Sequence, residues 1–126
     1  MLSATAQFSF LEDIDLGATG LAVTFVDGMD RPLLDVVVPG ADLLVTRAGW
    51  QLAAPLAGLT ALEIRPSPTS ARVILRATVP PVPLDDPAVP GTGLLVWRMR
   101  FGTDCGASLT LRCTGGPGGS RTCQEL

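Results

Sequence analysis

The chain has 126 residues, a formal net charge of −3 and 47% hydrophobic residues, which suits one domain with one core. It contains no Lys, His, Asn or Tyr, so all nine cations are Arg, and the common His- and Lys-based catalytic schemes are excluded. A pI near 4.7 argues against a nucleic-acid binder that works by neutralising phosphates. A GC-rich genome would produce the same missing residue types.

Alternating apolar residues predict short β-strands along most of the chain. The predicted strands cover residues 4–10, 21–26, 33–38, 42–47, 60–65, 71–78, 94–101 and 107–113. Asp27-Gly28 and Pro39-Gly40 are typical of turns, and residues 102–106 suit a hairpin turn. Residues 48–59 predict a loop with at most a short helical turn. Together these elements predict an all-β fold, a small β-sandwich of about seven to eight short strands.

The chain reads as a single β domain over residues 1–126. Residues 1–19 are expected to form an N-terminal edge strand and an acidic loop, 20–113 the core, and 114–126 a Gly/Cys tail. The Pro-rich residues 79–93 predict an exposed, stiff connection. No transmembrane segment is expected, because no apolar run reaches the ~18 residues that a spanning helix needs.

The location of the chain depends on whether a leader has been removed. The first ten residues lack the basic region of a secretory signal. We therefore expect either a cytoplasmic chain or one of the periplasm or cell envelope whose leader is gone. The acidic groups at residues 12–15 and 85–86 suit solvated loops better than a calcium site.

Three cysteines, Cys105, Cys113 and Cys123, lie near the C-terminus. Their spacing matches no zinc pattern and the chain has no His, so we expect neither a metal nor a cofactor. Cys113 and Cys123 are the easier disulfide pair, because the Gly-rich loop between them can close. A disulfide would imply an oxidising compartment, and the alternative is a set of reduced thiols in a frayed tail.

Three stretches resemble the AMIN domain, a small β-domain of bacterial amidases and type IV pilus secretins. They are RPLLDVVVPGA at residues 31–41, LTALEIR at 59–65 followed by ARVIL at 71–75, and TGLLV at 92–96. The resemblance covers roughly residues 20–99. It implies a sandwich of two small sheets that binds peptidoglycan or docks on envelope partners without catalysis of its own.

Four arginines fall on the outward phase of two predicted strands. They are Arg72, Arg76, Arg98 and Arg100. If these strands are neighbours, the four would form a stripe of guanidinium groups suited to bidentate contacts with carboxylates, including those on peptidoglycan stems. The alternative is an ordinary solvated strand face on which Arg is the only cation that this composition offers.

The two tryptophans differ in their sequence context. Trp97 is in phase with Leu95 and Met99, which predicts a core position. Trp50 lies in the irregular segment, where it could stack on a sugar or cap the open end of the sandwich.

The expected function is that of a non-catalytic cell-envelope β-domain that binds peptidoglycan or an envelope partner protein. Its candidate binding residues are the four arginines and Trp50. The alternative is a structural β-sandwich subunit that self-assembles, as a homo-oligomer, or docks on a protein partner. That alternative depends on Ile74, Leu94 and Val96, apolar residues that lie among the arginines as an interface would require.

Overall fold

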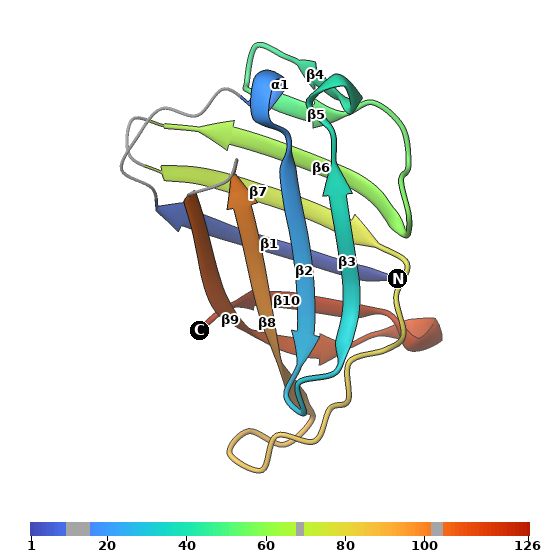
Figure 1. Cartoon of the computed structure of the whole chain (residues 1–126). Helices are drawn as coiled ribbons and strands as arrows, with labels where there is room; N and C mark the ends of the chain where they lie inside the picture. Colours follow the sequence, from blue (N-terminus) through green and yellow to red (C-terminus); the bar gives the residue numbers. More distant parts are fainter. Residues whose placement is uncertain (10–15, 68–69, 102–104) are drawn as a thin grey trace.

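Ten β-strands in one sheet make up most of the fold (Figure 1). A computed structural model describes residues 1–9, 16–67, 70–101 and 105–126. The strands are β1 Leu2–Ser9, β2 Leu21–Asp27, β3 Pro32–Val38, β4 Leu43–Val45, β5 Trp50–Leu52, β6 Leu59–Pro66, β7 Ser70–Ala77, β8 Thr92–Phe101, β9 Cys105–Gly115 and β10 Arg121–Glu125. The helical elements are α1 Leu16–Thr19, η1 Gly40–Asp42 and η2 Pro117–Gly119. None of the helices in this described part of the chain is long and apolar enough to cross a membrane.

The all-β prediction is confirmed, but the sheet differs from the expected sandwich of seven or eight strands. Its strands follow one another in the order β3-β2-β8-β9-β10-β1-β7-β6-β5-β4. Two of them were not predicted, namely β5 in the expected loop and β10 in the expected tail. The predicted N-terminal edge strand is also wrong, because β1 pairs with β7 on one side and, in parallel, with β10 on the other. Such long-range pairing leaves no trace in local periodicity.

The sheet folds back on itself, and the core lies between its two halves. In Figure 1, β2, β3 and β8 pass steeply across β1, β6 and β7. The rings of Phe8 on β1 and Trp97 on β8 have centroids 5.1 Å apart, although β9 and β10 separate these two strands in the sheet. Phe25 on β2 adds a second edge-to-face contact with Trp97, at 5.3 Å. The predicted core position of Trp97 is therefore confirmed.

The two end strands of the sheet, β3 and β4, are joined by residues 39–42. The predicted strands on either side of Pro39-Gly40 both exist, but β3 pairs with β2 and β4 with β5. A Cβ atom on Gly40 would lie 2.2 Å from the carbonyl oxygen of Gly17, so only glycine lets η1 approach α1 this closely. This connection brings the two edges of the sheet together at one corner.

The Pro-rich segment between β7 and β8 is more than an exposed connection. Most of it is exposed, but the side chain of Val82 is buried in the core. The guanidinium of Arg121 donates a 2.8 Å hydrogen bond to the carbonyl of Val82, and the amide of Asp86 donates to the carbonyl of Thr92. These contacts fix the segment against the sheet.

Candidate functional site

Arg98 and Arg100 extend outward from β8, as the alternation predicts. Both side chains are exposed, whereas Met99 between them and Trp97 just before them are buried. Residues two apart on a strand lie roughly 7 Å apart on the same face. The two guanidinium groups therefore form a neighbouring pair on the outer surface.

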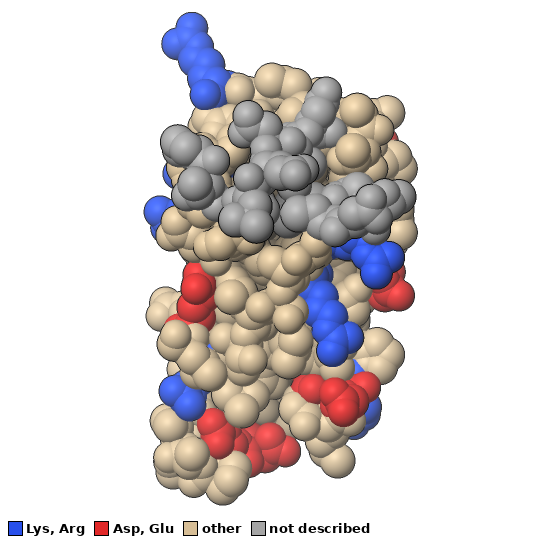
Figure 2. Space-filling view, turned by 60° about the vertical axis from the view of Figure 1, so that its left-hand side comes forward, with Lys and Arg blue, Asp and Glu red and all other residues tan. Residues whose placement is uncertain are grey.

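The predicted stripe of four arginines is wrong, because β7 and β8 are not neighbours. Three strands, β9, β10 and β1, lie between them in the sheet. On the face shown in Figure 2, arginine side chains form separate groups with other residues between them. Strands that are consecutive in the sequence can be far apart in a sheet when the terminal strands insert between them, as β1 and β10 do here.

Arg72 and Arg76 lie on a different part of the outer surface, on β7. Arg72 is opposite Gln7 of β1 and Arg65 of β6, and Arg76 is opposite Ser3 of β1. Arg76 also lines a shallow groove of about 350 Å³ beside β5 and β6. Arg65, which is opposite Arg72, forms an ion pair with Glu63 at 2.9 Å. The β7 arginines therefore lie beside a charge pair of β6, which the β8 arginines do not.

The β8 pair borders a larger groove of about 590 Å³, which we call the β8 groove. It runs over the outer faces of β3, β2, β8 and β9. Its lining includes Asp35 and Val37 of β3, Ala22 and Thr24 of β2, Arg98 and Arg100 of β8, and Gly106 and Ser108 of β9. The floor is made by the small residues of β2 and β9, so the long side chains of β8 and the acidic side chain of β3 stand on either side of β2.

The register places the charged groups of the β8 groove in a defined order. Thr24 is directly opposite Asp35 on one side and Arg98 on the other. Its hydroxyl donates to Asp35 Oδ1 over 3.4 Å. Within the described residues, the ion pairs involve Asp27, Glu63 and Asp86, and none involves Asp35, Arg98 or Arg100. The groove therefore holds charges of both signs that are free to meet a ligand.

Trp50 lies in strand β5 rather than in an irregular segment. It is opposite Val45 of β4 and Ile64 of β6. Its side chain is partly buried against the core, as the capping alternative predicts, and stacking on a sugar stays a prediction.

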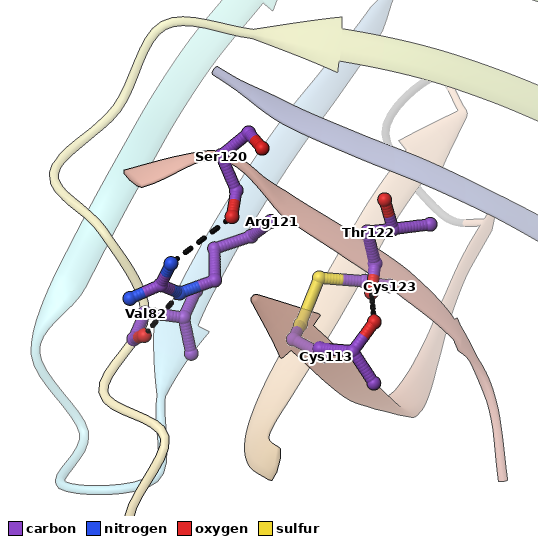
Figure 3. The surroundings of a disulfide bond; sticks show 7 residues. Val82, Cys113, Ser120, Arg121, Thr122 and Cys123 are labelled. Atoms are coloured by element: carbon purple, nitrogen blue, oxygen red, sulfur yellow. Dashed lines mark hydrogen bonds between the residues drawn. A yellow bond between two sulfur atoms is a disulfide. The ribbon is translucent and has the colours of Figure 1, made fainter. Parts of the chain in front are cut away.

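Cys113 and Cys123 form a disulfide between β9 and β10 (Figure 3). They are directly opposite each other, with Cα atoms 4.0 Å apart, and both side chains are buried. This is the pair that the spacing favoured, and residues 121–125 are a paired strand rather than a frayed tail. The side chain of Cys105 lies outside the described part of the structure, as do residues 12–15 of the predicted acidic loop.

The exposed apolar residues are not the ones expected from the sequence. Ile74, Leu94 and Val96 are half-buried. Besides Met29 between β2 and β3 and Leu126 after β10, the strongly exposed ones include two residues of the edge strands, Val37 of β3 at 70% and Val45 of β4 at 75%. Sequence reasoning missed them because it could not tell which strands end the sheet.

Asp27 is a buried carboxylate with a structural role at the turn after β2. Burial acts to raise its pKa, but the amides of Arg31 and Met29 and the Arg31 guanidinium donate hydrogen bonds of 2.9–3.0 Å to it. These contacts outweigh burial and lower the pKa of Asp27 below its ordinary value. Its charge therefore holds the β2–β3 turn.

No family model, curated protein or solved structure matches this chain. The resemblance of residues 20–99 to the AMIN domain stays a prediction.

Proposed function

We propose that this chain is a non-catalytic binding domain of the bacterial cell envelope. Its β8 groove binds carboxylate groups on the peptide stems of peptidoglycan. The observation that carries this proposal is the pair Arg98 and Arg100, two exposed guanidinium groups side by side on one strand with no carboxylate partner among the described residues. Guanidinium groups bind carboxylates through two parallel hydrogen bonds, which gives geometry as well as charge.

Two further observations support an envelope location. The sequence resembles an envelope domain over residues 20–99. The buried Cys113–Cys123 disulfide suits an oxidising compartment such as the periplasm.

Each contact in the groove is expected to be weak. Ion pairs at exposed sites are worth about 0.2–1 kcal/mol each, and salt screens them. A sacculus, however, presents many stems on one polymer, and this high concentration of sites allows a domain with weak affinity for each stem to be retained. The proposed function therefore predicts salt-sensitive retention.

The test is co-sedimentation with purified sacculi. Arg98→Ala/Arg100→Ala is expected to abolish retention at low salt while keeping the thermal midpoint, because both side chains are exposed. Arg72→Ala/Arg76→Ala is the matched control, since it removes the same charge from β7 outside the β8 groove. Equal retention of the two double variants would show that the β8 groove is not the binding site.

A second candidate function is self-association through the edge strand β3. This strand ends the sheet, has seven residues and one charge, and presents Val37 to solvent. A second copy could pair with it in antiparallel fashion about Val36, which sets Val37 opposite Asp35 of the other copy and keeps the two carboxylates apart.

Sedimentation velocity over a range of concentrations tests this second candidate. We expect a weak dimer that Val37→Asp dissociates, because the new carboxylate lies directly opposite Asp35 of the other copy and like charges in that position oppose pairing. Leu44→Asp on the other edge strand, β4, adds the same charge as a control and should leave the dimer intact. A wild-type chain that stays monomeric at all concentrations excludes this candidate.

A further inference from the structure

The β8 groove carries opposite charges on its two sides. Asp35 stands on β3, and Arg98 stands on β8, with Thr24 of β2 between them in the register. Both charged side chains are exposed and line the same groove. A ligand that only offered carboxylates would use Arg98 and Arg100 and would be repelled by Asp35.

The distance between the two sides restricts the ligand. Neighbouring strands lie about 4.8 Å apart, so Asp35 and Arg98 have backbones separated by about 10 Å. The ammonium and carboxylate of a single α-amino acid are attached to one carbon atom and lie much closer together than these two backbones. A peptide in which a long side chain carries the amine and the next residue carries the terminal carboxylate can hold the two charges about this far apart.

The floor of the groove suits such a peptide. Ala22 and Gly106 leave room above the sheet, Thr24 places a hydroxyl group between Asp35 and Arg98, and Ser108 places another on the far side of Arg98. Hydroxyl groups donate to and accept from peptide groups equally well. The middle of the groove therefore accepts a polar main chain, while its two sides select the end charges.

We propose that the β8 groove recognises a zwitterionic peptide segment, with an ammonium group at Asp35 and a carboxylate at Arg98 and Arg100. This inference rests on the proposed function and narrows its ligand to stem peptides that have a free side-chain amine as well as a free terminal carboxylate. A stem whose amine is already cross-linked offers no ammonium group. The groove thus favours stems that are not yet cross-linked.

Two synthetic peptides test the inference. Both are tetrapeptides with an acetylated N-terminus, a lysine in third position and a free C-terminal carboxylate, and one of them is also acetylated at the lysine amine. Each is titrated into the full chain labelled with ¹⁵N, and affinity is read from amide shifts on β2, β3 and β8. We expect the free-amine peptide to bind roughly three- to fivefold more tightly, the gain typical of one exposed ion pair.

Asp35→Asn separates this effect from the rest of the site. In that variant both peptides should bind with equal affinity, because the carboxylate that distinguishes them is gone. One outcome would overturn the inference and leave the proposed function standing: the two peptides bind the wild-type chain with equal affinity, and neither peptide binds Arg98→Ala/Arg100→Ala. If neither peptide shifts any amide signal of the groove, both fail.

Discussion

The disulfide between Cys113 and Cys123 makes the sharpest prediction about stability. It ties β10 to β9, and β10 is the strand through which β1 and the rest of its half join the sheet. Replacing both cysteines by alanine, Cys113→Ala/Cys123→Ala, removes the cross-link without introducing a polar group into the core. A background of Cys105→Ala prevents exchange with the third thiol.

The expected loss follows from the loop that the disulfide closes. The two cysteines are 10 positions apart. Closing a loop of this size lowers the conformational entropy of the unfolded chain by about 9 cal/mol/K, which stabilises the folded state by about 2.7 kcal/mol at room temperature. For a domain of this length, 1 kcal/mol corresponds to about 4 °C in Tm, so we expect Tm to fall by about 11 °C.

Thermal unfolding followed by circular dichroism measures this loss. The oxidised parent, the parent reduced under denaturing conditions and refolded, and the double alanine variant are compared, with intact mass reporting the thiol state. The reduced parent and the alanine variant should agree within about 1 kcal/mol, because they differ only in two buried sulfur atoms. A Tm that falls by less than about 3 °C in both would refute the idea that the cross-link stabilises the sheet.

Further substitutions at Asp27, Gly93 and Trp97, with Gly28 as a control, test the packing of the sheet and its turns. Asp27→Asn should lower the free energy of unfolding by about 2 kcal/mol near neutral pH. Since the folded pKa of Asp27 is lowered, this difference should begin to shrink below about pH 4, where the unfolded carboxyl takes up its proton, and vanish only when the pH falls below the folded pKa. Gly93→Ala should lower the free energy of unfolding by about 1–3 kcal/mol, measured by urea titration, because the new Cβ would lie 1.8 Å from the Pro83 carbonyl oxygen. Gly28→Ala is the control. Its new Cβ would have no atom closer than 3.9 Å, so its stability should be nearly unchanged. Trp97→Phe should lower the free energy of unfolding by about 1–2 kcal/mol and Trp97→Ala by about 3–5 kcal/mol. The smaller loss is expected for Phe because the indole N–H has no acceptor among the described residues, so only ring volume is removed. Equal losses in the two Trp97 variants would contradict this.

Local periodicity predicted the strands with a strong apolar alternation, and it predicted their phase. In β8 the buried Leu95, Trp97 and Met99 alternate with the exposed Arg98 and Arg100, and each side chain lies on the expected side. This works because successive residues of a strand must face opposite sides of the sheet, whatever strand lies next to it.

The elements that were missed have few inward-facing apolar side chains of their own. β10 buries only Cys123 among its five residues, and β5 buries only Leu52 among three. Both strands form because a neighbouring strand supplies hydrogen-bond partners, namely β9 and β1 for β10 and β6 for β5. Such partners are contributed from far along the chain, so the sequence of the strand itself carries no signal for them.

The candidate site was found only in part for the same reason. The sequence identified Arg98 and Arg100 as an outward pair, but it grouped them with Arg72 and Arg76. It assigned no role to Asp35, whose importance depends on β2 lying between β3 and β8. No spacing along the chain connects residue 35 with residue 98.

Strand β2 explains why the groove lies where it does. Its inward side chains, Leu21, Val23 and Phe25, are large and fill the core, while its outward ones, Ala22 and Thr24, are small. On β7 the outward side chains Arg72, Ile74 and Arg76 are longer, and the groove that Ile74 and Arg76 line beside β5 and β6 is smaller, at about 350 Å³. The same alternation that makes β2 a core strand therefore creates a floor between the acidic side of β3 and the basic side of β8, and binding at that floor requires no movement of the sheet.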